Sequence, residues 1–150
     1  MSLAEWERNG WLRRHQAQAS EIADLFAVAD RDIHDSATRG LSDDWRFAIA
    51  YNASLQLARA ALQAAGYETP KGEAHHFRAL QSLEHTIKLD APQRDLLDVY
   101  RKKRSASVYD RSGMISKADA DDMLRIAKNL RALIGSWIRS KNPALMVDVK

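Results

Sequence analysis

The stretch SKADADDMLRIAKNLRALIGSWI, residues 116–138, determines the fold class, because it holds both the start signal and the apolar face of a long helix. Ser116 and Asp119 have the spacing of a capping box, with the shorter acid in the third position. Apolar residues then recur every three or four positions, which places them on one helical face. They are Met123, Ala127, Leu130, Ile134 and Trp137, widened by Leu124, Leu133 and Ile138. Asn142-Pro143 ends the pattern, so residues 144–150 are predicted to form a loose tail.

The chain before this stretch carries four more helical segments. A broken pattern covers residues 4–33, and Asn9-Gly10 splits off its first turn. The others are predicted at 44–65, 74–88 and 91–108, with Ser42 or Asp43 capping the first and Asp90 the last. Their inward faces are Tyr51, Leu55, Ala58, Leu62 and Ala65; Phe77, Leu80, Leu83 and Ile87; and Leu96, Leu97, Val99 and Tyr100.

The segment pattern predicts an all-α protein. No run rich in Val, Ile and Thr alternates as a strand does. The connections are short, and short connections favour antiparallel neighbours. We therefore expect a single domain over 1–150, an up-and-down antiparallel bundle of four main helices plus a shorter N-terminal helical element.

Composition excludes several functional classes. The 150 residues are 45% hydrophobic and contain no Cys, which rules out a disulfide framework, a thiol nucleophile and a Cys-based zinc site. Glu5, Glu7 and Arg8 interrupt any signal-peptide core, and no apolar run approaches the roughly 18 residues of a membrane span. These features predict a soluble cytoplasmic protein without membrane partners.

The charge is unevenly distributed along the chain. The net charge is +3, but residues 1–100 carry 11 Lys and Arg against 15 Asp and Glu, a net of −4. Residues 101–150 carry 12 against 5, a net of +7. Regions of opposite sign on one small domain indicate either a basic binding face or self-association through charge complementarity.

Much of the positive charge lies in RKKRSASVYD, residues 101–110. Four adjacent cations repel one another unless something offsets them, and a phosphate-bearing ligand, a nucleotide or RNA, would do so. A plain solvated surface is an equally good interpretation of such a run. At about 100° per residue, Arg101 and Arg104 share a face, whereas Lys102 and Lys103 fan outward. We expect Arg104 to bind a phosphate as a bidentate fork, with the lysines adding long-range attraction.

His75 and His76 are a second candidate feature. Adjacent histidines point about 100° apart on a helix, so they do not chelate one metal, and a metal site would also need Glu73 or a distant acid. One histidine could instead pack on Phe77 or cap the helix, or one could meet a phosphate or a catalytic group. No glycine-rich phosphate loop or G-x-S-x-G elbow is present. The sequence therefore predicts neither a metal nor a cofactor.

The order of these motifs resembles that of HEPN domains. The matching parts are ALQAAGY at a helix end, GEAHHFRAL opening the next helix, RKKRSASVYD, and SKADADDMLRIAKNLRALIGSWI. The resemblance covers about residues 44–143. It implies an all-α homodimer that binds nucleotides or RNA. Many members are RNases, or partners of minimal nucleotidyltransferases in toxin–antitoxin pairs. A nucleotidyltransferase-type protein is therefore an expected partner.

Active members of that family carry an arginine, a polar residue and, after a spacer, a histidine, and two copies cleave RNA without metal across a dimer cleft. Arg104 matches the arginine and Ser105 the polar position, but Tyr109 stands where histidine is expected. Longer spacers reach Asp110 or Arg111, neither of which is histidine. A tyrosine with an ordinary pKa near 10 is a poor general base at pH 7.

Two functions follow from this departure. The first is a non-catalytic binding module, with Arg101, Lys102, Lys103, Arg104, Ser105, Tyr109 and Asp110 contacting nucleotide or RNA, or a partner protein. The second is a metal-independent RNase in which Arg104 acts with Tyr109, Asp110 or His76. A histidine within hydrogen-bond reach of Arg104 would favour the enzyme.

Overall fold

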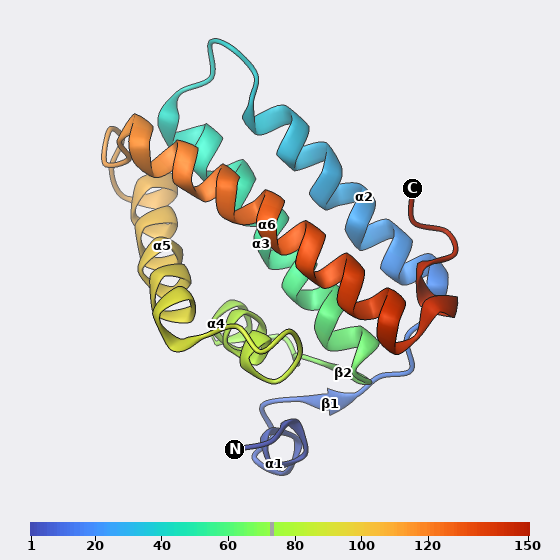
Figure 1. The fold of residues 1–150 in the computed structure, drawn as a ribbon. Coiled ribbons are helices and arrows are strands. Elements are labelled where there is room, and N and C mark those ends of the chain that lie inside the picture. The colour runs from blue at the N-terminus through green and yellow to red at the C-terminus, as the bar shows by residue number, and fades with distance from the viewer. Residues whose placement is uncertain (73) are drawn as a thin grey trace.

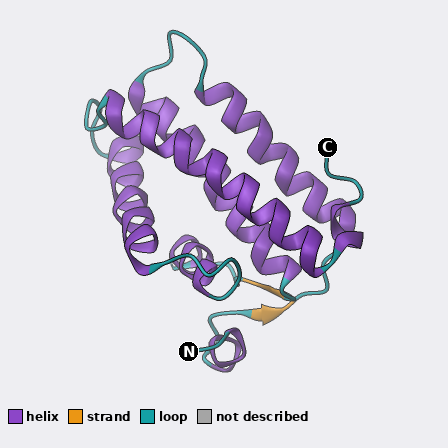
Figure 2. Cartoon of the chain, viewed as in Figure 1, coloured by secondary structure: helices purple, strands orange, loops and turns teal. Residues whose placement is uncertain are grey.

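The computed structural model describes residues 1–72 and 74–150, and the prediction of an all-α protein is confirmed (Figures 1 and 2). The helices are α1 (Leu3–Arg8), α2 (Ala19–Ser36), α3 (Asp43–Ala64), α4 (His75–Gln81), α5 (Ala91–Tyr109) and α6 (Lys117–Lys141). Two 3₁₀ turns, η1 (Ser82–Glu84) and η2 (Pro143–Met146), and a ribbon of β1 (Arg13–Arg14) and β2 (Tyr67–Glu68) complete it. Within the described residues, no helix combines the length and apolar character needed to cross a bilayer.

Helix α3 is the centre of the fold. It packs along most of its length between α2 and α6, and α5 lies across it at an angle (Figure 1). Its side chains are buried on several faces, because alanines alternate with larger residues and allow close approach of its neighbours. The core between these helices contains Phe26, Phe47, Tyr51, Leu130 and Ile134, all nearly fully buried.

The local start signals read from the sequence are present. The Ser42 hydroxyl accepts from the backbone N–H of Trp45, and the Asp90 carboxylate accepts from that of Gln93. Ser116 and Asp119 form the complete capping box at the start of α6. These side chains satisfy N–H groups that the first helical turn leaves without partners. The helices they start therefore begin within one residue of the prediction.

The long helices are not all the ones that the sequence predicted. The segment predicted at 74–88 is a helix of 7 residues followed by a 3₁₀ turn, and Lys88 takes a left-handed φ of 59°, which a helix cannot continue through. The N-terminal region instead supplies an 18-residue helix, α2. It extends beyond Ile33 to Ser36, whose hydroxyl donates to the carbonyl of Ile33.

Three further expectations about side chains and the tail are wrong. Phe77 and Val99, predicted to face inward, are 36% and 49% exposed. The segment expected as a loose tail forms η2 and packs on α6 and α2, where Leu145 and Met146 are buried. Two apolar side chains so close to the end of α6 remove enough surface from water to hold the segment in place.

Candidate functional site

Three of the four cations of the basic segment bind carboxylates of the chain itself. Arg101 donates from Nε to Asp98 at 2.8 Å, and the ammonium of Lys102 lies 3.3 Å from the same carboxylate. Although burial alone would raise it, the pKa of Asp98 lies below its usual range because of these two partners. Lys103 does not fan outward as predicted, because its ammonium donates to Asp119 of α6 at 3.0 Å. Most of the charge in this run is therefore locally compensated.

Arg104 differs from its three neighbours. Among the described residues, no carboxylate lies within ion-pair distance of it. Its guanidinium carbon lies 5.5 Å from the ring centroid of Tyr51 and 5.8 Å from that of Tyr109, which is within cation–π range. Its Nε is buried and has no acceptor within the described part of the chain. The guanidinium thus keeps both an uncompensated charge and an unused donor.

Tyr51 connects Arg104 to His76. The tyrosine ring is 1% exposed, and its hydroxyl oxygen lies 3.4 Å from Nδ1 of His76 on α4. Burial raises the pKa of Tyr51 to about 12, so the phenol stays protonated at neutral pH and can donate to the imidazole. Arg104 and His76 thus contact the same buried tyrosine from different helices, although no hydrogen bond joins them within the described residues.

His76 is neutral in this environment. Its pKa is lowered to about 4, first by burial and then by the neighbouring His75 and the charge of Arg104. At pH 7 the ring is therefore unprotonated, so it can accept a hydrogen bond but cannot act as a general acid. His75 has a different setting, since its Nδ1 lies 2.6 Å from the carbonyl oxygen of Gly72 and its ring packs 4.3 Å from that of His76.

The remaining predicted site residues lie at the exposed end of α5. Tyr109 is 71% exposed, and Ser105 and Asp110 are exposed as well. The backbone N–H of Asp110 closes the helix by donating to the carbonyl of Ala106. Arg104 and His76 thus contact Tyr51, and Tyr109 lies against the guanidinium of Arg104, whereas Lys102, Lys103, Ser105 and Asp110 do not join them. We call Arg104, Tyr51, His76 and Tyr109 the Arg104 site.

Sequence reasoning placed Tyr51 in the core but missed its contact with His76, and it missed a polar stripe on α3. Asn52, Gln56, Arg59 and Gln63 follow one another at i, i+4, i+7 and i+11 in a helix that is otherwise rich in Ala and Leu. Polar residues at helical spacing on an otherwise apolar helix indicate a face that the core does not cover, and this signal was available in the sequence.

The stripe on α3 is a hydrogen-bonded ladder. Arg59 donates from Nη1 to Gln56 at 2.6 Å, and Gln56 donates to Asn52 at 3.1 Å. Asn52 in turn donates to the buried carboxylate of Asp32 on α2 at 2.7 Å. The ladder holds the guanidinium of Arg59 in a fixed position without placing a carboxylate against it.

Comparisons of the chain with protein-family models, with curated proteins and with solved structures find no match. Glu73, which a metal site beside the histidines would need, lies outside the described residues. Within the described ranges, three or more His, Cys, Asp or Glu side chains are nowhere grouped as metal ligands.

Proposed function

We propose that the protein is a HEPN-like module that binds nucleotide or RNA through the Arg104 site. One observation carries the proposal: of the four adjacent cations, Arg104 is the one without a carboxylate partner in the described residues, and its buried Nε lacks an acceptor. A buried donor without an acceptor costs about 1–3 kcal/mol, and a phosphate oxygen would remove that cost.

The guanidinium group suits this role for a geometric reason. Its planar donors match two oxygens of one phosphate, and the nearby rings of Tyr51 and Tyr109 restrict its orientation. The exposed Tyr109 supplies a ring on which a base could stack and a hydroxyl that could donate to a phosphate. Lys102 adds attraction at longer range.

A metal-independent RNase is the alternative, with Arg104 stabilising phosphate charge and His76 or Tyr109 replacing the missing histidine. The contact of both Arg104 and His76 with Tyr51 favours His76 over Tyr109 as the substitute. Against the enzyme stands the pKa of His76, about 4, because an imidazole this weakly basic transfers protons poorly at pH 7. We therefore prefer the binding module.

The HEPN resemblance extends the proposal to assembly. We infer an up-and-down arrangement of the long helices and a homodimer that uses α3 and α5 or the segment around Tyr109. The short turns before α3 and before α6 support antiparallel neighbours. A toxin–antitoxin role with a nucleotidyltransferase-type partner, in the cytoplasm, is the setting that the resemblance implies.

Binding of a labelled single-stranded RNA and of a nucleoside triphosphate, measured by fluorescence anisotropy, tests the proposal. Arg104→Lys should weaken binding by at least about tenfold, since a point charge cannot replace a planar fork. Lys102→Ala should weaken binding less. Its effect should become smaller as the salt concentration rises, because this lysine acts through counterion release. Equal losses in both variants would show a nonspecific basic surface, and unchanged binding in both would refute the proposal.

An RNase assay of the same proteins separates the two functions. Cleavage by the wild type that disappears in both Arg104→Ala and His76→Ala would establish the enzyme in place of the binding module. Binding without cleavage supports the module. Arg125→Ala, a change at an exposed cation on α6, serves as the control for general loss of positive charge.

A further inference from the structure

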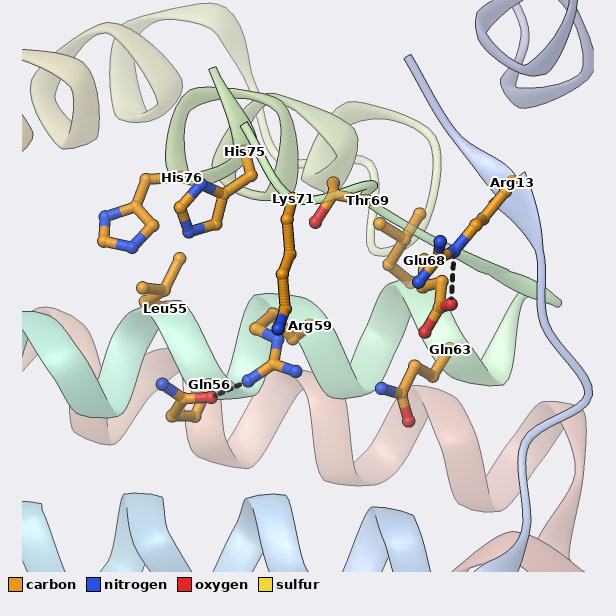
Figure 3. A pocket seen from close by; sticks show the side chains of 11 residues that line it. Arg13, Leu55, Gln56, Arg59, Gln63, Glu68, Thr69, Lys71, His75 and His76 are labelled. Carbon is orange, nitrogen blue, oxygen red and sulfur yellow. Dashed lines mark hydrogen bonds and ion pairs between the residues drawn. The ribbon is translucent and has the colours of Figure 1, made fainter. Parts of the chain in front are cut away.

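A cavity of about 370 Å³ lies between α3, β2 and the loop that leads into α4, beyond the Arg104 site (Figure 3). We call it the Arg59 pocket. Its polar lining comes from Arg59, Gln63, Thr69, Lys71, His75 and His76, and Leu55 and Leu62 add apolar wall. The volume lies in the range of small-molecule sites, roughly 300–1,000 Å³.

Two cations of this pocket have no carboxylate partner among the described residues. Arg59 binds only the neutral amide of Gln56, and within the described residues neither it nor Lys71 has a carboxylate in ion-pair distance. Figure 3 shows Lys71 extending from the loop toward α3 and the guanidinium of Arg59. The one described acid of the lining, Glu68, is taken by Arg13 at 2.6 Å. Two like charges directed at one space repel unless an anion lies between them.

The pocket is prepared by the fold. The hydrogen-bonded ladder from Asp32 through Asn52 and Gln56 holds Arg59 from behind, so its position does not depend on a ligand. Gln63, one helical turn further, is only 7% exposed, yet its Oε1 has no hydrogen-bond partner in the described part of the chain. A ligand in this cationic cavity would complete the hydrogen bonding of that buried amide.

We propose that the Arg59 pocket binds the phosphate monoester of a small organic molecule, with Arg59 and Lys71 as the charged contacts. A monoester carries a charge of about −1.5 to −2 at pH 7, which balances two cations, whereas a carboxylate would leave one uncompensated. Thr69, His75 and His76 supply side-chain hydrogen-bonding groups. Leu55 and Leu62 give the organic part of the ester an apolar surface.

The same chemistry is found at the terminal phosphate of an RNA, so free esters and RNA ends are both sources of the group. The proposal does not rest on the role of Arg104, because the charges, the ladder and the cavity belong to α3, β2 and the loop before α4. The two sites meet at His76, which lines the pocket and also contacts Tyr51.

Isothermal titration calorimetry on the full chain tests the proposal with five probes. They are inorganic phosphate, adenosine 5′-monophosphate, adenosine, an oligoribonucleotide with a 5′-phosphate, and the same oligoribonucleotide without it. Saturable binding at millimolar concentration or below is expected for a phosphorylated probe and not for adenosine. Binding of the mononucleotide identifies a free ester as a ligand. Binding of the oligonucleotide that requires its 5′-phosphate, without mononucleotide binding, identifies an RNA end.

Variants then locate the site. Arg59→Gln and Lys71→Gln should each weaken binding about tenfold or more, as loss of a charge-assisted contact does. Lys71 is exposed, so its replacement should not affect folding. Lys71→Gln therefore still tests the site if Arg59→Gln does not fold. Lys128→Gln, an equal change of charge at an exposed lysine on α6, should leave monophosphate binding unchanged.

Three results would overturn the proposal. These are no binding of any phosphorylated probe by the wild type, wild-type affinity in Lys71→Gln and in a folded Arg59→Gln, or an equal loss in Lys128→Gln. If Arg104→Lys abolishes RNA binding while monophosphate binding persists, both sites stand. If Arg104→Lys leaves RNA binding unchanged while Arg59→Gln weakens monophosphate binding, the proposed role of Arg104 is refuted and the Arg59 pocket stands.

Discussion

The hydrogen-bonded ladder behind Arg59 allows the loss of folding stability in Asn52→Ala to be predicted. The carboxylate of Asp32 is 5% exposed, and Arg31 binds its Oδ1 at 2.9 Å. Its Oδ2 accepts from Asn52 at 2.7 Å, and no other donor to that oxygen is present in the described residues. Alanine at position 52 therefore leaves one oxygen of a buried carboxylate without a donor, and it also removes the acceptor of Gln56.

The magnitude follows from the first of these losses, the hydrogen bond to the Asp32 carboxylate. A hydrogen bond to a charged group contributes about 1.5–3 kcal/mol to stability. The higher helix propensity of alanine offsets this by about 0.5 kcal/mol, which leaves a net loss of about 2 kcal/mol. At about 2–4 °C per kcal/mol for a chain of this size, the Tm falls by about 4–8 °C.

Urea unfolding at pH 7, followed by circular dichroism, measures the loss directly. Asn129→Ala is the matched control, since this asparagine is exposed within α6 and its replacement changes helix propensity alone. It should leave stability unchanged or raise it slightly. If the two variants differ by less than about 0.5 kcal/mol, the size expected of an ordinary surface change, the ladder does not stabilise the fold.

Three further predictions concern the cap, the histidine and assembly. Ser116→Ala removes the acceptor for the N–H of Asp119 and should cost about 1 kcal/mol in urea unfolding; the exposed Ser136→Ala should not, and equal effects would contradict the capping role. Because the pKa of His76 is lowered from 6.5 to about 4, the unfolded chain binds more protons between these values. Stability that is present above pH 6.5 should therefore be lost as the pH falls toward 4, and His76→Gln should flatten this dependence. An NMR titration of His76 with a midpoint near 6.5 would refute the assignment. Sedimentation at tens of micromolar should show a homodimer, and a monomer there would count against self-association.

The sequence predicted the residues of the candidate site better than the contacts between them, because several contacts join residues that are far apart along the chain. The basic run, the adjacent histidines and Tyr109 are visible in the sequence. The carboxylate partner of each cation cannot be read from the sequence. Lys103 binds a carboxylate 16 residues away on α6, whereas Arg101 binds one on its own helix. Of the four adjacent cations, only Arg104 has no carboxylate partner in the described residues, and the run of cations by itself does not reveal this difference.

The sequence by itself determined the helices and most of their beginnings. Caps such as Ser42, Asp90 and Ser116 act on N–H groups three residues ahead, so local sequence contains all the information that they need. The tertiary structure alone decided that α3 is central and that Tyr51 meets His76 across 25 residues of chain. It also decided the pairing of β1 with β2, which brings Arg13 and Glu68 into the lining of the Arg59 pocket. Such contacts depend on how whole helices pack, and periodicity specifies which face of a helix is apolar but not which neighbour covers it.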